Sequence, residues 1–228
     1  MAPGRGGNVR LIDLTHAIES SMPVFAGYPK PSLVPWTTHE AHGYAAEAAF
    51  MITHCGTHVD APWHFEKRGR RIDEVPASQL FCKAAVLDCR RPGPAGIIGP
   101  RALREAEKSC SQDSPRGSAA LLVTGHARRW GRRDYLVSYP GLSAAGARYL
   151  RRRGYGAVGV DSPNLDAPEA TGFPAHHALL GAGVVIVENL ANLEALLLQR
   201  RRRITLVALP LKLRGASGSP VRAVALVG

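Results

Sequence analysis

Short apolar runs recur along the chain and alternate with segments that have the apolar spacing of helices. The runs are rich in aliphatic residues and bounded by turn residues, so they predict buried strands. The predicted strands are residues 9–15, 45–53, 84–88, 119–124, 157–160, 184–187 and 204–209. The predicted helices are residues 100–109, 143–153 and 193–201, with a short helical turn at residues 76–79. This alternation predicts an α/β domain.

Residues typical of helix ends and loops support these assignments. Ser143 is a suitable N-cap for the helix that follows it, and Gly154 is a typical stop. Pro100 suits the first turn of its helix. Residues 22–35 hold four prolines, which predict an ordered loop.

The chain shows no internal repeat and no linker, so we expect a single domain over residues 9–228. The Gly- and Arg-rich residues 1–8 are expected to form a disordered tail. A length of 228 residues with 45% hydrophobic content suffices for a sizeable core. No uncharged apolar stretch approaches the ~20 residues that span a bilayer, and the start lacks the apolar run of a signal peptide. These features predict a cytoplasmic protein that does not contact a membrane.

The net charge of +11 comes mostly from clustered arginines. Such a charge is also found in nucleic-acid-binding proteins, but no recognised binding motif accompanies the clusters. We therefore interpret them as solvated helix ends and loops and expect no nucleic-acid partner. A basic nucleic-acid-binding protein without enzymatic activity is kept as an alternative. The four cysteines have no metal-site or redox spacing and are expected to be free thiols, with Cys55 filling space.

Candidate chemistry is concentrated in one segment. His54, His58, Asp60 and His64 lie within eleven residues, and imidazole and carboxylate groups suit a divalent metal. The segment contains glycine and Pro62, so it is expected to bend rather than to form a regular helix.

These groups exceed the three protein ligands that a catalytic zinc normally takes. The surplus indicates either a second metal or a free acid/base group. His64, at the far end of the segment, is the candidate for the acid/base because the pKa of an imidazole is readily set near neutrality.

The run His-Cys-Gly-Thr-His-Val-Asp-Ala-Pro-Trp-His-Phe over residues 54–65 resembles the signature of the cyclase family, which includes bacterial kynurenine formamidase and isatin hydrolase. The resemblance covers nearly the whole chain. Further matching segments are 11–15 with 22–23 and Gly27, 174–180 with 185–190, and 209–214 with 218–222. It implies the family's swivelling β/β/α fold, a single domain with a mixed, barrel-like sheet and flanking helices.

The resemblance also implies roles for individual residues. His54, His58 and Asp60 would hold one metal, and Asp60 with Glu188 would bridge to a second metal, which His176 also binds. His64 would be the acid/base, and one or two Zn²⁺ per subunit, or alternatively Mn²⁺, would be bound. We also expect a homo-oligomer, either a dimer or a tetramer.

Two neighbouring residues leave alternatives open. His177 stands next to His176 and is the alternative ligand, although the family register favours His176. Asp161 follows a strand and either orients ligands or occupies a turn.

The expected activity is hydrolysis of a small aromatic amide, lactam or lactone by metal-activated water. A polyketide-type cyclase or dehydratase with the same metal site is the alternative. Kynurenine formamidases carry Trp-Pro-Gly-Asp after their Met-Pro pair, whereas this chain has Phe25-Ala26-Gly27-Tyr28. Phe25 is therefore the expected substrate-binding residue, and it indicates a flat aromatic substrate without a charged amino-acid tail.

Overall fold

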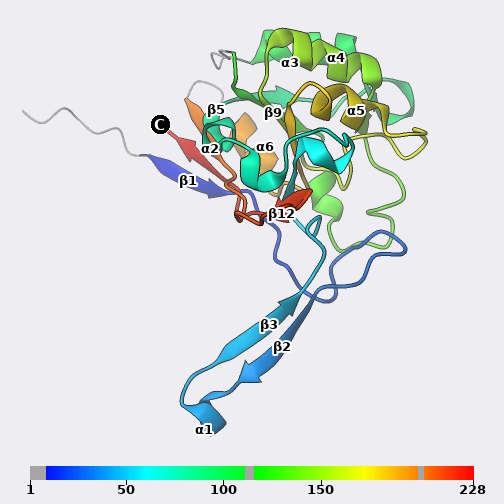
Figure 1. The fold of residues 1–228 in the computed structure, drawn as a ribbon. Coiled ribbons are helices and arrows are strands. Elements are labelled where there is room, and N and C mark those ends of the chain that lie inside the picture. The colour runs from blue at the N-terminus through cyan, green and yellow to red at the C-terminus, as the bar shows by residue number, and fades with distance from the viewer. Residues whose placement is uncertain (1–8, 111–115, 200–202) are drawn as a thin grey trace, which may run out of the picture.

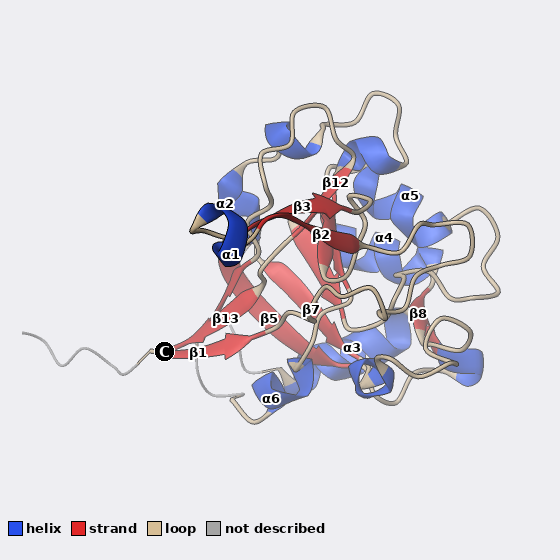
Figure 2. Cartoon of the chain, turned by 90° about the horizontal axis from the view of Figure 1, so that it is seen from below, coloured by secondary structure: helices blue, strands red, loops and turns tan. Residues whose placement is uncertain are grey.

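A curled mixed sheet of nine strands forms the centre of the computed structural model, which describes residues 9–110, 116–199 and 203–228 (Figure 1 and Figure 2). In spatial order the strands are β1 (Arg10–Asp13), β13 (Val224–Val227), β11 (Ile204–Val207), β5 (Phe81–Asp88), β7 (Ala119–Val123), β9 (Ala157–Val160), β10 (Val185–Glu188), β4 (His58–Asp60) and β12 (Gly218–Pro220). The central strands β5, β7, β9 and β10 run parallel. Antiparallel strands extend the sheet on both sides, so elements from both ends of the chain lie at its edges.

Both faces of the central strands are buried. Within β7, Leu121 and Val123 contribute to one hydrophobic cluster, while Ala120 and Leu122 contribute to the other. Strands buried on both faces have nearly continuous apolar sequences. This explains why the pattern of the sequence identifies them.

Helices cover the two faces unequally. The helices α3 (Pro100–Ser109), α4 (Ala144–Arg153) and α5 (Pro174–Leu180) pack on one face. The shorter helices α2 (Ala77–Leu80) and α6 (Leu193–Leu197) close the other face together with the edge strands. α5 also contacts β10 and the 3-10 helix at Pro62–His64. These contacts bring together three elements that carry candidate functional residues.

A β-ribbon projects from this body (Figure 1). Its strands β2 (Ser32–Thr37) and β3 (Ala46–Phe50) pair antiparallel, and the short helix α1 (His39–His42) joins them at the tip. We call residues 32–50 the arm. The remaining elements are β6 (Ile97–Ile98), β8 (Gly141–Leu142) and the 3-10 helices at Ile72–Glu74, Pro94–Gly96 and His126–Arg129.

The α/β fold class is confirmed, and the predicted strands and helices recur with small shifts at their ends. The caps expected for α4 are present: the Ser143 side chain accepts a hydrogen bond from Gly146 N, and Gly154 ends the helix with φ 87°. Among the described residues, no helix has the length and apolarity needed to cross a membrane.

Several elements were not predicted, among them α5 and the strands β4, β12 and β13. The hydrophobic pattern does not predict β4 because two of its three residues are polar, although all three are buried. The loop predicted for residues 22–35 is wrong at its end, where β2 begins at Ser32. Its Pro35 is tolerated because β2 is a strand of an isolated ribbon. The helix expected over residues 193–201 ends at Leu197; residues 200–201 and the predicted tail lie outside the described residues.

Candidate metal centre

Five of the side chains singled out in the sequence meet at one end of β4 and β10. His58 and Asp60 lie on β4, and Glu188 is the last residue of β10. His176 lies on α5, and His54 precedes β4. Glu188 stands opposite His58 in the antiparallel register. Since residues two apart on a strand share a face, the register itself places His58, Asp60 and Glu188 together.

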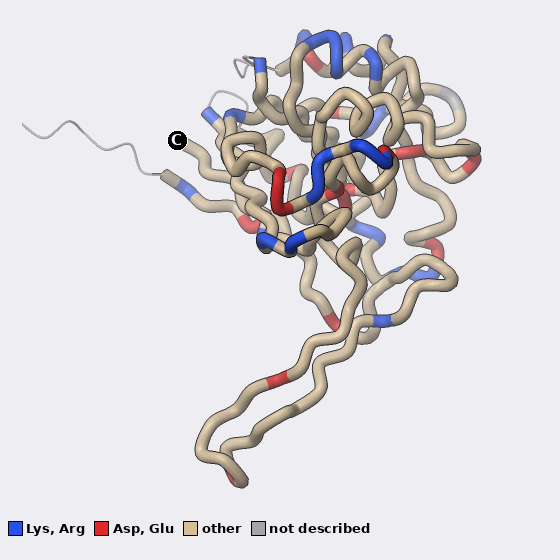
Figure 3. The backbone as a smooth tube through the Cα atoms, in the orientation of Figure 1, with Lys and Arg blue, Asp and Glu red and all other residues tan. Residues whose placement is uncertain are grey.

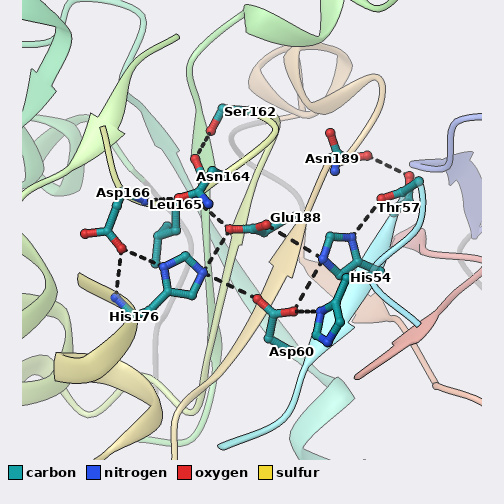
Figure 4. Close-up of polar contacts among 12 residues, drawn as sticks. His54, Thr57, Asp60, Ser162, Asn164, Leu165, Asp166, His176, Glu188 and Asn189 are labelled. Carbon is teal, nitrogen blue, oxygen red and sulfur yellow. Dashed lines mark hydrogen bonds and ion pairs between the residues drawn. The ribbon is translucent and has the colours of Figure 1, made fainter. Parts of the chain in front are cut away.

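Asp60 occupies the centre of the cluster (Figure 4). Its Oδ1 lies 2.6 Å from His54 Nδ1 and 3.3 Å from His58 Nε2, and its Oδ2 lies 3.5 Å from His176 Nε2. Glu188 Oε1 is 3.2 Å from His176 Nε2, and Glu188 Oε2 is 3.7 Å from His58 Nε2. Two groups of side chains that share Asp60 can therefore each hold a metal ion. They are His54, His58 and Asp60, and Asp60, His176 and Glu188.

Two of the histidines are turned toward the cluster by hydrogen bonds on their other ring nitrogen. His58 Nδ1 donates to Gly56 O over 2.8 Å, which leaves Nε2 facing Asp60. His176 Nδ1 is 2.6 Å from Asp166 Oδ2, which leaves its Nε2 facing Glu188. Such partners fix the tautomer and the ring orientation of metal-binding histidines.

Asp166 is itself held at the start of α5. Its Oδ1 accepts a hydrogen bond from Ala175 N at 2.7 Å, and its Oδ2 accepts one from His176 N at 3.1 Å. A carboxylate at this position satisfies amides that have no partner within the helix. The buried Asp166 therefore orients the backbone and the ring of His176 at once.

His54 is held from the far end of the chain. Its Nε2 lies 2.8 Å from Ser217 Oγ. The next residue, Gly218, lies so close that a Cβ there would be 2.6 Å from His54 Cε1. A glycine is therefore required for the ring to pack on β12.

The backbone behind Glu188 is fixed by a hydrogen-bond network. The following residue, Asn189, has φ 55°, a left-handed conformation that asparagine adopts more readily than most residues. Thr57 Oγ1 donates to Asn189 O over 2.6 Å, and the Tyr135 hydroxyl lies 2.8 Å from Asn189 Oδ1. These contacts connect the turn before β4 to the end of β10.

The charge balance of the cluster fits a divalent cation. Burial alone would lower the pKa of His58, but its hydrogen bond to Asp60 and the charges of Asp60 and Glu188 raise that pKa to about 9. Burial would likewise lower the pKa of His176, yet hydrogen bonds to Asp166, Asp60 and Glu188 raise it well above its ordinary value. Asp60 Oδ2 is buried and makes no hydrogen bond. Buried carboxylates require positive charge, and a metal ion would supply it while the imidazoles stay neutral.

His64 borders the cluster but makes no hydrogen bond through its ring to any described residue. The ring stacks on His54 with centroids 3.8 Å apart and lies 6.5 Å from the ring of His176. Burial lowers its pKa to about 4. His64 is therefore a neutral imidazole beside the ligand groups.

A cavity of about 530 Å³ opens over the cluster. Its wall is rich in aromatic side chains, namely Phe25, Tyr28, Phe65, Tyr139 and Phe173. Phe65 and Phe173 face each other with centroids 5.1 Å apart. None of the described residues that line the cavity is a lysine or an arginine, although the chain carries 29 of them.

The family model described as "Putative cyclase" matches residues 12–167. The chain belongs to the cyclase family. A kynurenine formamidase from Salinibacter ruber is 30% identical over 234 residues, which cover 94% of this chain and 96% of that protein. Isatin hydrolase A from Labrenzia aggregata, solved with benzyl benzoate bound, has 28% identity and a TM-score of 0.84 over 96% of this chain and 94% of that one. A structure described as a potential metal-dependent hydrolase with cyclase activity has 25% identity and a TM-score of 0.77 over 96% and 98% of the two chains.

The similarities to the formamidase and to isatin hydrolase extend over almost the entire chain, so this member of the cyclase family is an enzyme of the hydrolase class. The alternative of a nucleic-acid-binding protein without enzymatic activity is therefore wrong.

Two residues of this cyclase-family chain whose roles the sequence left open do not belong to the ligand groups. His177 is half-exposed and lies 2.9 Å from Glu66 Oε1. Asp161 accepts hydrogen bonds from the backbone and side chain of Thr124 and from Gly125 N, so it joins β9 to the end of β7.

The cysteines in the described part of the chain are free thiols, as expected. Cys55 is buried with its Sγ 3.7 Å from Met22 Sδ, which agrees with a space-filling role.

The sequence did not predict the roles of Asp166, Ser217, Tyr135 and Asn189. Ser217 lies 163 residues from its partner His54. Asp166 lies in an irregular segment that no periodicity marks. Their contribution depends on tertiary contacts. The only signal in a single sequence is that Asp166 and His176 are separated by just ten residues.

Proposed function

We propose that this protein hydrolyses a carbon–nitrogen or ester bond of a small, uncharged aromatic amide, lactam or lactone. The observation that carries the proposal is the pair of ligand groups sharing Asp60 beneath an aromatic cavity, among whose described lining residues there is no lysine or arginine. His54, His58 and Asp60 would hold one metal ion, and Asp60, His176 and Glu188 a second. A divalent cation bound there polarises a carbonyl and lowers the pKa of an attacking water. The set of nitrogen and carboxylate ligands suits Zn²⁺ and also accepts Mn²⁺.

The side chains of this chain would divide the remaining work. Phe25 and Tyr28 would stack on the ring of the substrate and orient its carbonyl group toward the metal ions that the cluster would hold. Phe65 and Phe173 exclude bulk water from the cavity. His64, a neutral imidazole beside the ligands, takes a proton and returns it to the leaving nitrogen or oxygen.

The absence of basic residues among the described lining residues bears on the substrate. A free α-carboxylate would find no lysine or arginine in the wall, so N-formylkynurenine would gain little from its amino-acid tail. An uncharged aryl amide, lactam or lactone has no carboxylate, so its binding does not require a basic residue in the wall. This preference is consistent with Phe25 and Tyr28 replacing the Trp and Asp of kynurenine formamidases.

The decisive experiment combines metal analysis with isotope incorporation. Protein purified without chelator should contain about one to two equivalents of divalent metal. Chelation should abolish turnover, and Zn²⁺ or Mn²⁺ should restore it. Turnover in H₂¹⁸O should place one label in the product. A product that forms without the label would instead support the polyketide-type cyclase or dehydratase. Protein that contains no metal and gains no activity on addition of Zn²⁺ or Mn²⁺ would contradict the proposed metal centre.

Two expectations about the whole protein accompany this proposal. We propose that it works as a homo-oligomer, a dimer or a tetramer. We also propose that it acts in the cytoplasm, where its free thiols would stay reduced.

A further inference from the structure

Asn189 follows the candidate ligand Glu188 in the chain, and hydrogen bonds hold all of its polar atoms except one. Its backbone N–H donates to Ser162 O over 3.1 Å. Its backbone O accepts from Thr57 Oγ1 over 2.6 Å (Figure 4). The hydroxyl of Tyr135 donates to its Oδ1 over 2.8 Å. These bonds fix both the backbone and the side-chain carbonyl group of Asn189.

The contact with Tyr135 determines which end of the amide remains free. Burial raises the pKa of Tyr135, and the charges of Asp161 and Glu188 raise it further, so the hydroxyl keeps its proton and acts as the donor. The amide oxygen of Asn189 must therefore face Tyr135, which leaves the NH₂ group without this partner. Among the described residues, Asn189 Nδ2 has no hydrogen-bond partner, and the atom is not fully shielded from solvent.

The free NH₂ group belongs to the wall of the cavity above the candidate metal centre. Asn189 lines this cavity although it is only 8% exposed. A buried donor meets little competition from water, and a side chain that is already held in place loses little entropy when a ligand binds. Asn164 also lines the cavity with an amide, but it is half-exposed. Asn189 is therefore the better preorganised donor of the two.

The charge of the surroundings makes such a donor useful. Lysine and arginine segments are spread over the body of the chain (Figure 3). None of the described residues that line the cavity is a lysine or an arginine. Negative charge that develops on a substrate in this cavity therefore finds no basic side chain of these two types. An N–H group of a fixed amide is a neutral donor that can stabilise it.

We infer that Asn189 is a catalytic residue whose Nδ2 donates a hydrogen bond to the oxygen of the scissile carbonyl group. The inference rests on the proposed hydrolysis of an amide, lactam or lactone. As the oxygen of water bonds to the carbonyl carbon, the π electrons of the C=O bond move onto the carbonyl oxygen, and the water gives one proton to His64. The charge on the carbonyl oxygen strengthens its hydrogen bond with Asn189.

The same hydrogen bond weakens again in the second half of the reaction. When the C=O bond forms again, the bond to the leaving nitrogen or oxygen breaks, and His64 returns the proton to the leaving atom. Asn189 is already in place before the charge appears, so it stabilises this intermediate without reorganisation. Tyr135 is the positioning residue, since it acts on the substrate only through Asn189.

Asn189→Gly removes the donor and keeps a residue suited to the φ of 55°. We expect kcat for the best aromatic substrate to fall roughly 10²–10³-fold, the usual effect of losing one such donor. KM and metal content should stay close to those of wild type, because the lost bond is strongest in the transition state. The matched control is Asn192→Gly. Asn192 has the same φ of 55°, but it is exposed and its Nδ2 donates to Asp13 O, so kcat and KM should not change.

Nuclear magnetic resonance measures the contact without turnover. The ¹⁵N-labelled full chain is loaded with Zn²⁺, which is diamagnetic. The chain has four asparagines and three glutamines, so the side-chain amide signal of Asn189 can be assigned by its loss in Asn189→Gly. Acetophenone, an aryl ketone, should shift this signal, whereas ethylbenzene, which lacks the oxygen, should not. In Tyr135→Phe the signal should move or broaden even without ligand, and kcat should fall by less than in Asn189→Gly.

Three results would overturn the inference. They are an Asn189 signal that does not respond to the ketone, an Asn189→Gly variant with the kcat of wild type, and a variant in which KM alone has risen. Hydrolysis by wild type would then leave the proposed function standing. Conversely, a shift caused by the ketone in a protein that hydrolyses no amide, lactam or lactone would refute the proposed function and support the contact at Asn189.

Discussion

Asp166 Oδ2 lies 2.6 Å from His176 Nδ1, and the same carboxylate accepts the backbone N–H of His176. This contact sets which nitrogen of His176 faces Asp60 and Glu188. Asp166→Asn would place an amide NH₂ against at least one of these donors. We expect the affinity of the second metal group to fall roughly 10–100-fold, the usual effect of losing such a partner. Titration of chelated protein against a competing metal indicator measures it.

Ser217 provides the matched comparison, because it holds the other metal group. Ser217→Ala removes the hydroxyl that contacts His54 Nε2 and should weaken the first metal group while sparing the second. A His177→Ala control, which changes a half-exposed neighbour outside the cluster, should bind metal as wild type does. Equal weakening of both groups by Asp166→Asn and by Ser217→Ala would show that the cluster does not contain two separable sites.

His64→Ala tests the assignment of the acid/base. Since His64 contacts the ligands through ring stacking alone, its removal should leave the metal content unchanged. Turnover should fall by roughly 10²–10⁴, the range for loss of a general acid–base group. His64→Gln, which keeps more of the side-chain volume, should be equally slow. Loss of metal from both variants would mean that His64 is a ligand.

Phe25→Ala tests the aromatic wall. Phe25 lines the cavity from the Pro-rich segment before the arm. Loss of its ring should lower kcat/KM for the best uncharged aromatic substrate by about tenfold, the order expected for one lost stacking contact. Wild type should hydrolyse N-formylkynurenine poorly beside an aryl lactam or lactone. Efficient hydrolysis of N-formylkynurenine would refute the preference for uncharged substrates, and an unchanged kcat/KM in Phe25→Ala would exclude this segment from the wall.

Asp161 predicts a pH-dependent stability that does not involve the metal centre. Burial raises its pKa to about 6 from an ordinary value of 3.8. The folded protein therefore binds this proton more tightly than the unfolded chain does. The stabilisation is complete below about pH 3.8 and is lost as the pH rises through about 6.

The non-titrating variant Asp161→Asn isolates this effect. Between pH 4 and pH 7, the free energy of unfolding of wild type minus that of the variant should fall by about 2 kcal/mol, since one pKa unit corresponds to about 1.4 kcal/mol and Asp161 of the unfolded chain is already partly ionised at pH 4. Urea denaturation of both proteins at each pH measures the difference, and the titration of other groups cancels in it. A difference that stays constant, or that grows with pH, would contradict the raised pKa.

The central sheet and the helices α3 and α4 could be predicted because their signals are local. Buried parallel strands are apolar throughout, and the cap at Ser143 and the stop at Gly154 are visible in the sequence. β4 could not be predicted in this way. It is a buried strand whose outer residues, His58 and Asp60, are polar because they belong to the cluster. A buried strand is normally apolar, but the cluster requires polar side chains at these positions, and the sequence of β4 follows the requirement of the cluster.

The candidate ligands were found because four of the relevant groups are close in sequence and the others match a family motif. The residues that orient them were not found. Ser217 contacts His54 from the start of the neighbouring strand β12, far away in the sequence, and Asp166 acts through the start of α5, which the sequence did not predict as a helix. The arm was predicted only in part, for a related reason. The segment of β3 was predicted as a strand, but the prolines of residues 22–35 indicated a loop where β2 begins, and the pairing of β2 with β3 is visible only in the folded chain.

The position of β4 between β10 and β12 has a consequence for how the protein is made. His54 reaches Ser217 only after 163 further residues have been synthesised. At about 5–20 residues per second this takes roughly 8–30 s on the ribosome. Until then His54 lacks this contact, and the segment from His54 to His64, which includes a thiol, can bind thiophilic metals without the selectivity of the finished site. We therefore expect the metal bound to newly synthesised protein to depend on which cations are present during synthesis, and not on the ligand geometry alone.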